Sequence, residues 1–120
     1  LLRYKGRSYP TSEHAFQAAK TLDQAARDLI ALTPSPKHAK QLGRRVNLRP
    51  DWDEVKIDIM YNIVLKKFTD HPDLRQKLLD TKDSVLIEGN TWGDQFWGVC
   101  NGVGENHLGK ILMQIRAQLS

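Results

Sequence analysis

The chain has 120 residues, 40% of them hydrophobic and 27% charged, a balance typical of one compact globular domain. No apolar run approaches the ~20 residues that a membrane-spanning helix requires, and a single cysteine excludes both an internal disulfide and a cysteine zinc cluster. We therefore expect one domain over residues 1–120, with no membrane partner, in a reducing cytoplasm. The sequence leaves the oligomeric state open.

The net charge of +4 is unevenly distributed along the chain. The first 49 residues hold ten Lys or Arg against three acidic residues, whereas the remaining 71 residues hold eight against eleven. Such asymmetry favours an anionic partner, such as a phosphate, a dinucleotide or a nucleic acid.

Caps and periodicity predict a mainly helical α+β fold, with about six helices and a few short strands. After a basic, turn-rich segment over residues 1–10, the expected helices cover residues 12–22, 23–32, 36–43, 52–68, 72–79 and 105–119. Ser35 before Pro36 is an N-cap followed by the residue that suits a first turn, and Gly43 ends that helix. The β-branched run over residues 84–88 predicts the one clear strand.

The helix over residues 52–68 is expected to be the main core helix, with Asp51 as its N-cap. Its apolar residues recur at helical spacing, and they are Trp52, Val55, Ile59 and Ile63. Because Trp52 lies on this apolar stripe, we expect it to pack in the core, and contact with a ligand is the alternative.

The first helix, with Thr11 or Ser12 as N-cap, carries the most informative pattern in the chain. Glu13, Gln17 and Lys20 fall at positions i, i+4 and i+7, so they share one face of the helix. An acid, an amide and an amine in line indicate a site, although spacing alone fits a solvated polar face equally well.

The glycine-rich segment over residues 89–104 carries the second concentration of functional residue types. Trp92 and Trp97 flank Asp94, so the segment is typical of a wall for an aromatic or sugar-like group. Packing of both tryptophans into the core beneath an irregular loop is the alternative. Asp94, between aromatic residues, must be paired, exposed or functional.

Two phosphate-binding patterns can be tested from the sequence. Gly104, Gly109 and Lys110 match a P-loop, but Ile111 stands where Ser or Thr must hold magnesium, which argues against a nucleotide triphosphatase. The free amides at the start of this last helix remain a candidate site for one phosphate. The four histidines show no metal-ligand spacing, so no metal is expected.

Taken together, the motifs of this chain resemble the NADAR family, which includes N-glycosidases. The resemblance rests on Tyr9-Pro10-Thr11-Ser12-Glu13-His14-Ala15-Phe16-Gln17-Ala18-Ala19-Lys20, Leu42-Gly43-Arg44, Arg49-Pro50-Asp51-Trp52 with Lys56 and Met60, Lys67-Phe68, Trp92-Gly93-Asp94 with Trp97-Gly98, and Asn106-x-Leu108-Gly109. It implies a small α+β enzyme that cleaves N-glycosidic bonds without a cofactor. The implied substrates are ribosylamino-pyrimidine phosphates of riboflavin synthesis or ADP-ribosylated guanine, with nucleic acid as the carrier of the latter.

The resemblance also assigns roles to individual residues. Glu13 is the first choice for the acid and base, Lys20 stabilises a sugar phosphate or attacks the sugar as an amine, and Asp94 orients a sugar hydroxyl or water. The residues expected to bind substrate are Gln17, Arg44, Trp52, Lys56, Trp92, Trp97 and Asn106. From the sequence alone, Arg44 equally suits the C-terminal dipole of its own helix.

One departure from the family pattern bears on catalysis. Members usually begin with an extended segment that contains a Leu-Ser-Asn-Phe-like motif, and this chain starts after it. The alternative to a glycosidase is therefore a non-catalytic module that binds ADP-ribose or nucleic acid. A structural domain that has lost its site is a third interpretation, but retention of Glu13, Lys20 and Asp94 argues against it.

Overall fold

The computed structural model describes all 120 residues, which fall into two compact units, Leu1–Asp70 and His71–Ser120. The chain forms six helices and two small two-stranded sheets, so the predicted mainly helical α+β fold is confirmed. None of the helices is both long enough and apolar enough to cross a lipid bilayer.

The first unit begins with a β-hairpin where the sequence suggested only a turn-rich segment. Strands β1 (Leu2–Tyr4) and β2 (Arg7–Tyr9) pair antiparallel, with Leu2 opposite Tyr9. Lys5 and Gly6 both have positive φ, 51° and 78°, as a two-residue type I′ turn requires. Gly6 adopts this conformation freely, whereas a lysine does so rarely. Because Lys5 is not a typical turn residue, the sequence did not predict the hairpin.

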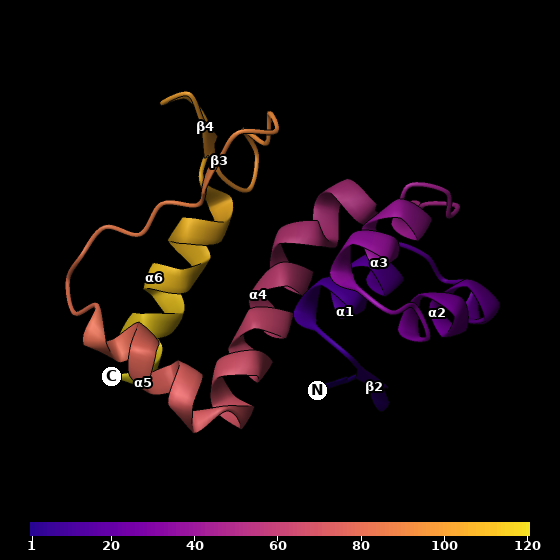
Figure 1. Cartoon of the computed structure of the whole chain (residues 1–120), viewed down its shortest axis with the longest axis horizontal. Coiled ribbons are helices and arrows are strands. Elements are labelled where there is room, and N and C mark those ends of the chain that lie inside the picture. Colours follow the sequence, from indigo (N-terminus) through magenta and orange to yellow (C-terminus); the bar gives the residue numbers. More distant parts are fainter. The chain divides into compact units, whose positions relative to one another are not determined.

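Helix α1 (Ser12–Ala19) is the centre of the first unit. It packs against α2 (Gln24–Ala31), α3 (Pro36–Gly43), α4 (Trp52–Asp70) and both strands. In Figure 1, α2, α3, α4 and the hairpin surround the helix labelled α1. The predicted caps of α1 and α3 are confirmed: Thr11 Oγ1 accepts from the His14 amide and Ser35 Oγ accepts from the His38 amide.

The long helix α4 has the expected period but a different buried face. Trp52 and Ile63 are buried as predicted, together with Met60 and Val64. Val55 and Ile59 are only half-buried, because they line a pocket beside the hairpin.

The second unit contains α5 (Pro72–Asp80), α6 (His107–Leu119) and the loop between them. The two helices pack together, and Arg116 of α6 donates to Thr81 Oγ1 and to the Ser84 carbonyl oxygen, each at 2.8 Å. Strands β3 (Gly89–Asn90) and β4 (Val99–Cys100) pair in parallel next to the first turn of α6 (Figure 1).

The strand predicted over residues 84–88 is wrong. Val85 and Ile87 are 74% and 61% exposed, and no neighbouring strand pairs with this segment. Side chains hold most of its backbone instead: besides the bond from Arg116 to Ser84, Asn106 Nδ2 donates to the Leu86 carbonyl and Asn106 Oδ1 accepts from the Glu88 amide, both at 2.9 Å. Regular pairing begins only at β3.

Helices α1 and α3 pack tightly against each other at Gly43. A Cβ atom on Gly43 would lie 1.9 Å from Gln17 Oε1, so only glycine leaves room for this buried amide. Gln17 is 3% exposed. The end of α3 therefore fixes both the position of α1 and the rotamer of Gln17.

We expect Gly43→Ala to destabilise the protein by about 1–3 kcal/mol through overpacking, although alanine is the better helix former. In a Gln17→Ala background the same substitution should be neutral or stabilising, because the methyl group then meets no amide. Urea unfolding of the four variants measures this coupling. Equal effects of Gly43→Ala in both backgrounds would contradict it.

Candidate active site

Helix α1 is anchored by a histidine that the sequence left unassigned. His14 is fully buried, with Nδ1 2.7 Å from Thr11 Oγ1 and Nε2 3.1 Å from the Thr33 carbonyl oxygen. Nε2–H donates to the carbonyl and Nδ1 accepts from the hydroxyl, which satisfies a neutral imidazole. His14 thus ties α1 to the segment between α2 and α3.

The structure brings Glu13 and Gln17 together as the helical spacing predicts. Gln17 Nε2 donates to Glu13 Oε1 at 2.9 Å, while Gln17 Oε1 lies against Gly43 without a hydrogen-bond partner. The reversed amide would place its carbonyl oxygen against the carboxylate, so only one orientation is favourable. The half-buried Glu13 is therefore held as a hydrogen-bond acceptor in a fixed position.

Lys20 lies half-buried at the end of the same stripe, in an environment that disfavours its charge. Burial lowers the pKa of the Lys20 ammonium group, and the positive charges of Lys40 and Arg44 lower it further, whereas Glu13 opposes the shift. Lys20 Nζ also lies 6.0 Å from the centroid of the Phe16 ring. A larger fraction of Lys20 is thus the neutral, nucleophilic amine than for an exposed lysine.

Lys40 is a component of this group that sequence analysis missed. It lies four residues before Arg44, so the two cations share one face of α3, and both influence Lys20. The i, i+4 spacing was the available signal. Arg44 forms the C-cap of α3 and is exposed, so it both complements the helix dipole and remains accessible to an anion.

Trp52 and Lys56 extend the group along α4. Trp52 is buried and contacts Phe16, with ring centroids 5.2 Å apart and an interplanar angle of 54°. Lys56 pairs with Asp53 at 3.2 Å, but Asp53 is 90% exposed, so this ion pair is weak. Trp52 therefore acts mainly as packing beneath Phe16, as its place on the apolar stripe predicts.

In the second unit, Asp94 organises the loop between β3 and β4. Its Oδ1 accepts from the backbone amides of Phe96 and Trp97 at 3.1 and 2.9 Å, and Asn90 Oδ1 accepts from the Asp94 amide. These bonds form an Asx turn that holds the carboxylate in place. The second carboxylate oxygen, Oδ2, is not used by the turn.

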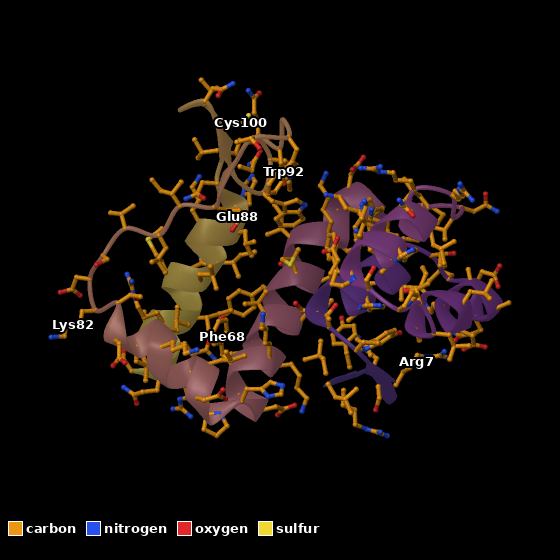
Figure 2. All side chains as sticks on the ribbon, in the orientation of Figure 1. Arg7, Phe68, Lys82, Glu88, Trp92 and Cys100 are labelled. Carbon is orange, nitrogen blue, oxygen red and sulfur yellow. The ribbon has the colours of Figure 1, made fainter.

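The two tryptophans of this loop have different environments. Trp97 belongs to an aromatic cluster, with its ring centroid 4.8 Å from Phe96 and 6.4 Å from His107. Trp92 is 65% exposed and projects from the loop after β3 (Figure 2). Neither tryptophan is buried in the core, so the interpretation of both as core plugs does not hold, and the tryptophan wall stays a prediction.

The first amides of α6 are already occupied. The backbone amides of Glu105, Asn106, His107 and Leu108 donate to the carbonyl oxygens of Gln95, Gly98, Phe96 and Trp97 at 2.7–3.3 Å. The hypothesis that this helix start binds a phosphate is therefore wrong, because its donors are already paired with the loop. The side-chain amide of Asn106 is likewise used, by Leu86 and Glu88, which gives Asn106 a role in shaping the loop.

The predicted site residues divide between the two units. The first unit holds Glu13, Gln17, Lys20, Arg44, Trp52 and Lys56, and the second holds Trp92, Asp94, Trp97 and Asn106. Within the first unit the structure groups the acid, the amide and the amine next to two further cations. No cluster of three or more His, Cys, Asp or Glu side chains has the geometry to hold a metal ion.

Comparisons with known proteins identify the family of this chain. The family model described as the NADAR domain matches residues 2–120. N-glycosidase YbiA of Shigella boydii is 41% identical over 122 residues, which cover 99% of this chain and 76% of that protein. The riboflavin biosynthesis protein PYRR, chloroplastic, of Zea mays is 39% identical over 125 residues, covering 93% of this chain and 20% of the maize protein.

A solved structure extends the similarity to the fold. The NMR structure of the Escherichia coli protein YbiA has a TM-score of 0.89 and 40% sequence identity, and the match covers 98% of this chain and 71% of that one. Sequence and fold agree over nearly the whole length. The chain therefore belongs to the NADAR family, and it is an enzyme of the N-glycosidase class.

Proposed function

We propose that this N-glycosidase hydrolyses the bond between C1 of a phosphorylated ribose and a pyrimidine nitrogen, in a ribosylamino-pyrimidine phosphate of riboflavin biosynthesis. The name of the maize relative supports this substrate class. The observation that carries the proposal is the Glu13 carboxylate, fixed by Gln17 on the same helical stripe as a lysine with a lowered pKa. ADP-ribosylated guanine of nucleic acid contains the same kind of bond and is the second substrate to test.

Glu13 supplies the proton transfers in this proposal. Cleavage leaves an electron pair on the departing nitrogen, which must be protonated, and develops positive charge at ribose C1. A carboxyl group suits both needs, because its acid form donates the proton and its anion stabilises the cationic sugar. The bond from Gln17 keeps the Glu13 oxygens in one orientation throughout.

Lys20 acts as the nucleophile in the proposed pathway, because its surroundings favour the neutral amine. Opening of the ribose breaks the C1–O4 bond, with a proton from Glu13 going to O4 and the nitrogen lone pair forming a C1=N bond. Nζ then adds to C1 while the π pair returns to the base nitrogen, and Glu13 passes the proton lost by Nζ to that nitrogen. The C1–N bond breaks with its electron pair going to the base, which leaves a C1=Nζ imine. Water then adds to the resulting imine, and the C1–Nζ bond breaks to release ribose phosphate and the free amine. The alternative role, in which a charged Lys20 stabilises the sugar phosphate, requires no covalent adduct.

The remaining residues are assigned to substrate binding. Lys40 and Arg44 attract the sugar phosphate, since both are exposed cations on α3. In the second unit, Asp94 Oδ2 lies outside the Asx turn and the exposed Trp92 offers a ring face, so the family resemblance makes them candidates for a sugar hydroxyl and for the base. Lys56 completes the proposed binding residues of the first unit, and Trp52 supports them by packing against Phe16.

Release of the sugar product from both substrates tests the proposal directly. Turnover of the ribosylamino-pyrimidine phosphate, with slower or no release of ADP-ribose from ADP-ribosylated guanine DNA, is the expected result. The reverse preference would assign the second substrate. If the folded protein releases product from neither, the chain is a non-catalytic binding module and the proposal fails.

Glu13→Gln is expected to lower kcat by about 10²- to 10⁴-fold, because the amide keeps the shape but transfers no proton. Ribose phosphate release under saturating substrate measures this loss. Glu54→Gln, which removes an exposed carboxylate from the first turn of α4, is the matched control and should retain full activity. Equal activity of Glu13→Gln and the control would remove Glu13 from the mechanism.

A second prediction concerns the covalent step. Borohydride added during turnover should reduce the imine and leave one sugar adduct on Lys20, detected by mass spectrometry of peptides. Lys20→Met should abolish the adduct, whereas Lys37→Met, at an exposed lysine of α3, should not. Turnover without any trapped adduct would assign Lys20 the electrostatic role instead.

The pH dependence of adduct formation tests the influence of the neighbouring cations. Only neutral Lys20 attacks, so the single-turnover rate should rise with pH and level off below the ordinary lysine pKa of 10.5. Arg44→Gln removes a positive charge and therefore raises the pKa of Lys20, so its profile should shift to higher pH. An unchanged profile in Arg44→Gln would show that Arg44 does not influence this amine.

A further inference from the structure

A pocket of about 500 Å³ lies within the first unit, on the face of α1 opposite the Glu13 stripe. Ala15 and Ala19 of α1 line it, and at 100° per residue these positions are turned roughly 160° and 120° away from Glu13. The hairpin, the start of α2 and the middle of α4 form the other walls. A volume of this size falls in the range of small-molecule binding sites.

The side chains that line the pocket carry more positive than negative charge. Its lining includes Lys5, Arg7, Arg27 and Arg49 against a single carboxylate, Asp58. Arg7 at the hairpin (Figure 2) pairs with Asp28, outside the lining, and Arg49 likewise pairs with its neighbour Asp51. These pairs neutralise two of the four positive charges.

Arg27 is the exception among the arginines. Its Nε donates to the carbonyl oxygens of Ala18 and Thr21 at 3.3 and 2.8 Å, and it forms no salt bridge. The guanidinium is therefore held in position by backbone while its charge is not neutralised. The two terminal nitrogens of Arg27 remain available to an anion, and a planar guanidinium suits a phosphate.

Two tyrosines add donors next to this charge. Tyr4 and Tyr9 line the pocket, and burial raises the pKa of both phenols. The positive charges of nearby arginines oppose this shift: Arg49 acts on Tyr4, Arg7 acts on Tyr9, and Arg27 acts on both. The phenols are thus neutral O–H donors at physiological pH. Arg27 lines the same pocket as both phenols.

The floor of the pocket is apolar. Ala15 and Ala19 contribute small side chains from α1, and the half-buried Val55 and Ile59 contribute branched ones from α4. A flat ring can lie on such a surface while a charged group reaches the arginine. The combination of a fixed cation, two phenols and an apolar floor matches a ligand with an anionic end and a ring.

We propose that this pocket is a second binding site, separate from the catalytic stripe, for a nucleoside monophosphate. Arg27 binds the phosphate together with the hydroxyl groups of Tyr4 and Tyr9. The base and ribose lie over the floor that α1 and α4 provide. The assignment stands on the pocket alone and does not depend on the glycosidase substrate.

Two-dimensional NMR of the 120-residue chain titrated with AMP tests the site. The changes in amide chemical shift should be largest at Tyr9, Ala19 and Ile59. They should fit a dissociation constant for AMP of about 0.01 to 1 mM. Adenosine and inorganic phosphate, as separate probes, should each bind at least about tenfold more weakly than AMP, since each lacks half of the contacts. Shifts centred on Glu13 and Lys20 instead, or no shifts up to about 10 mM AMP, would overturn the proposal.

Variants locate the phosphate contact. Arg27→Gln should weaken AMP binding by about tenfold or more, and Arg45→Gln, an exposed arginine outside the pocket, should leave it unchanged. Because Arg27 also bonds to backbone, two milder variants keep the test decisive. Tyr4→Phe removes only a hydroxyl, and Asn62→Trp fills the pocket from an exposed position on α4. Both should weaken AMP binding, and wild-type affinity in both folded variants would refute the site.

Discussion

The side-chain amide of Gln17, held between Glu13 and the bare Cα of Gly43, is the constraint on which the first unit depends. The buried amide of Gln17 has one favourable orientation, because its Nε2 group must face the Glu13 carboxylate to donate the hydrogen bond. The contact sets the distance between α1 and α3 and, through it, where Lys20 meets the cations of α3. The orientation of the Glu13 carboxylate and the packing of α3 against α1 thus both depend on a residue that transfers no proton itself.

The second unit reaches order by a different route, since its loop has hardly any regular pairing. Side chains take the place of strands: Asn106 holds residues 86 and 88, Asp94 holds the turn before Trp97, and Asn90 fixes Asp94 in turn. Each uses a short polar group to satisfy backbone atoms that a longer sheet would otherwise pair. Asp94 is therefore both an element of the loop and a proposed participant in the reaction.

Sequence reasoning recovered the features that local chemistry determines. The caps at Thr11 and Ser35 and the stop at Gly43 follow from residues next to each other in the chain, and the Glu13 stripe follows from helical geometry. It failed where distant residues decide. The segment over residues 84–88 has the composition of a strand, but its partner is a side chain eighteen or more residues away.

The pairing of the α6 amides with the carbonyls of residues 95–98 has a consequence for motion. Opening that part of the loop would expose the first turn of a helix, so the two must separate and reclose as one cooperative unit. Independent motion of the loop is then expected where its backbone is exposed and lacks these bonds, as at the tip around residues 91–93, which includes Trp92. A glycine-rich loop in this protein is thus a short flexible tip on a base as firmly held as the helix itself.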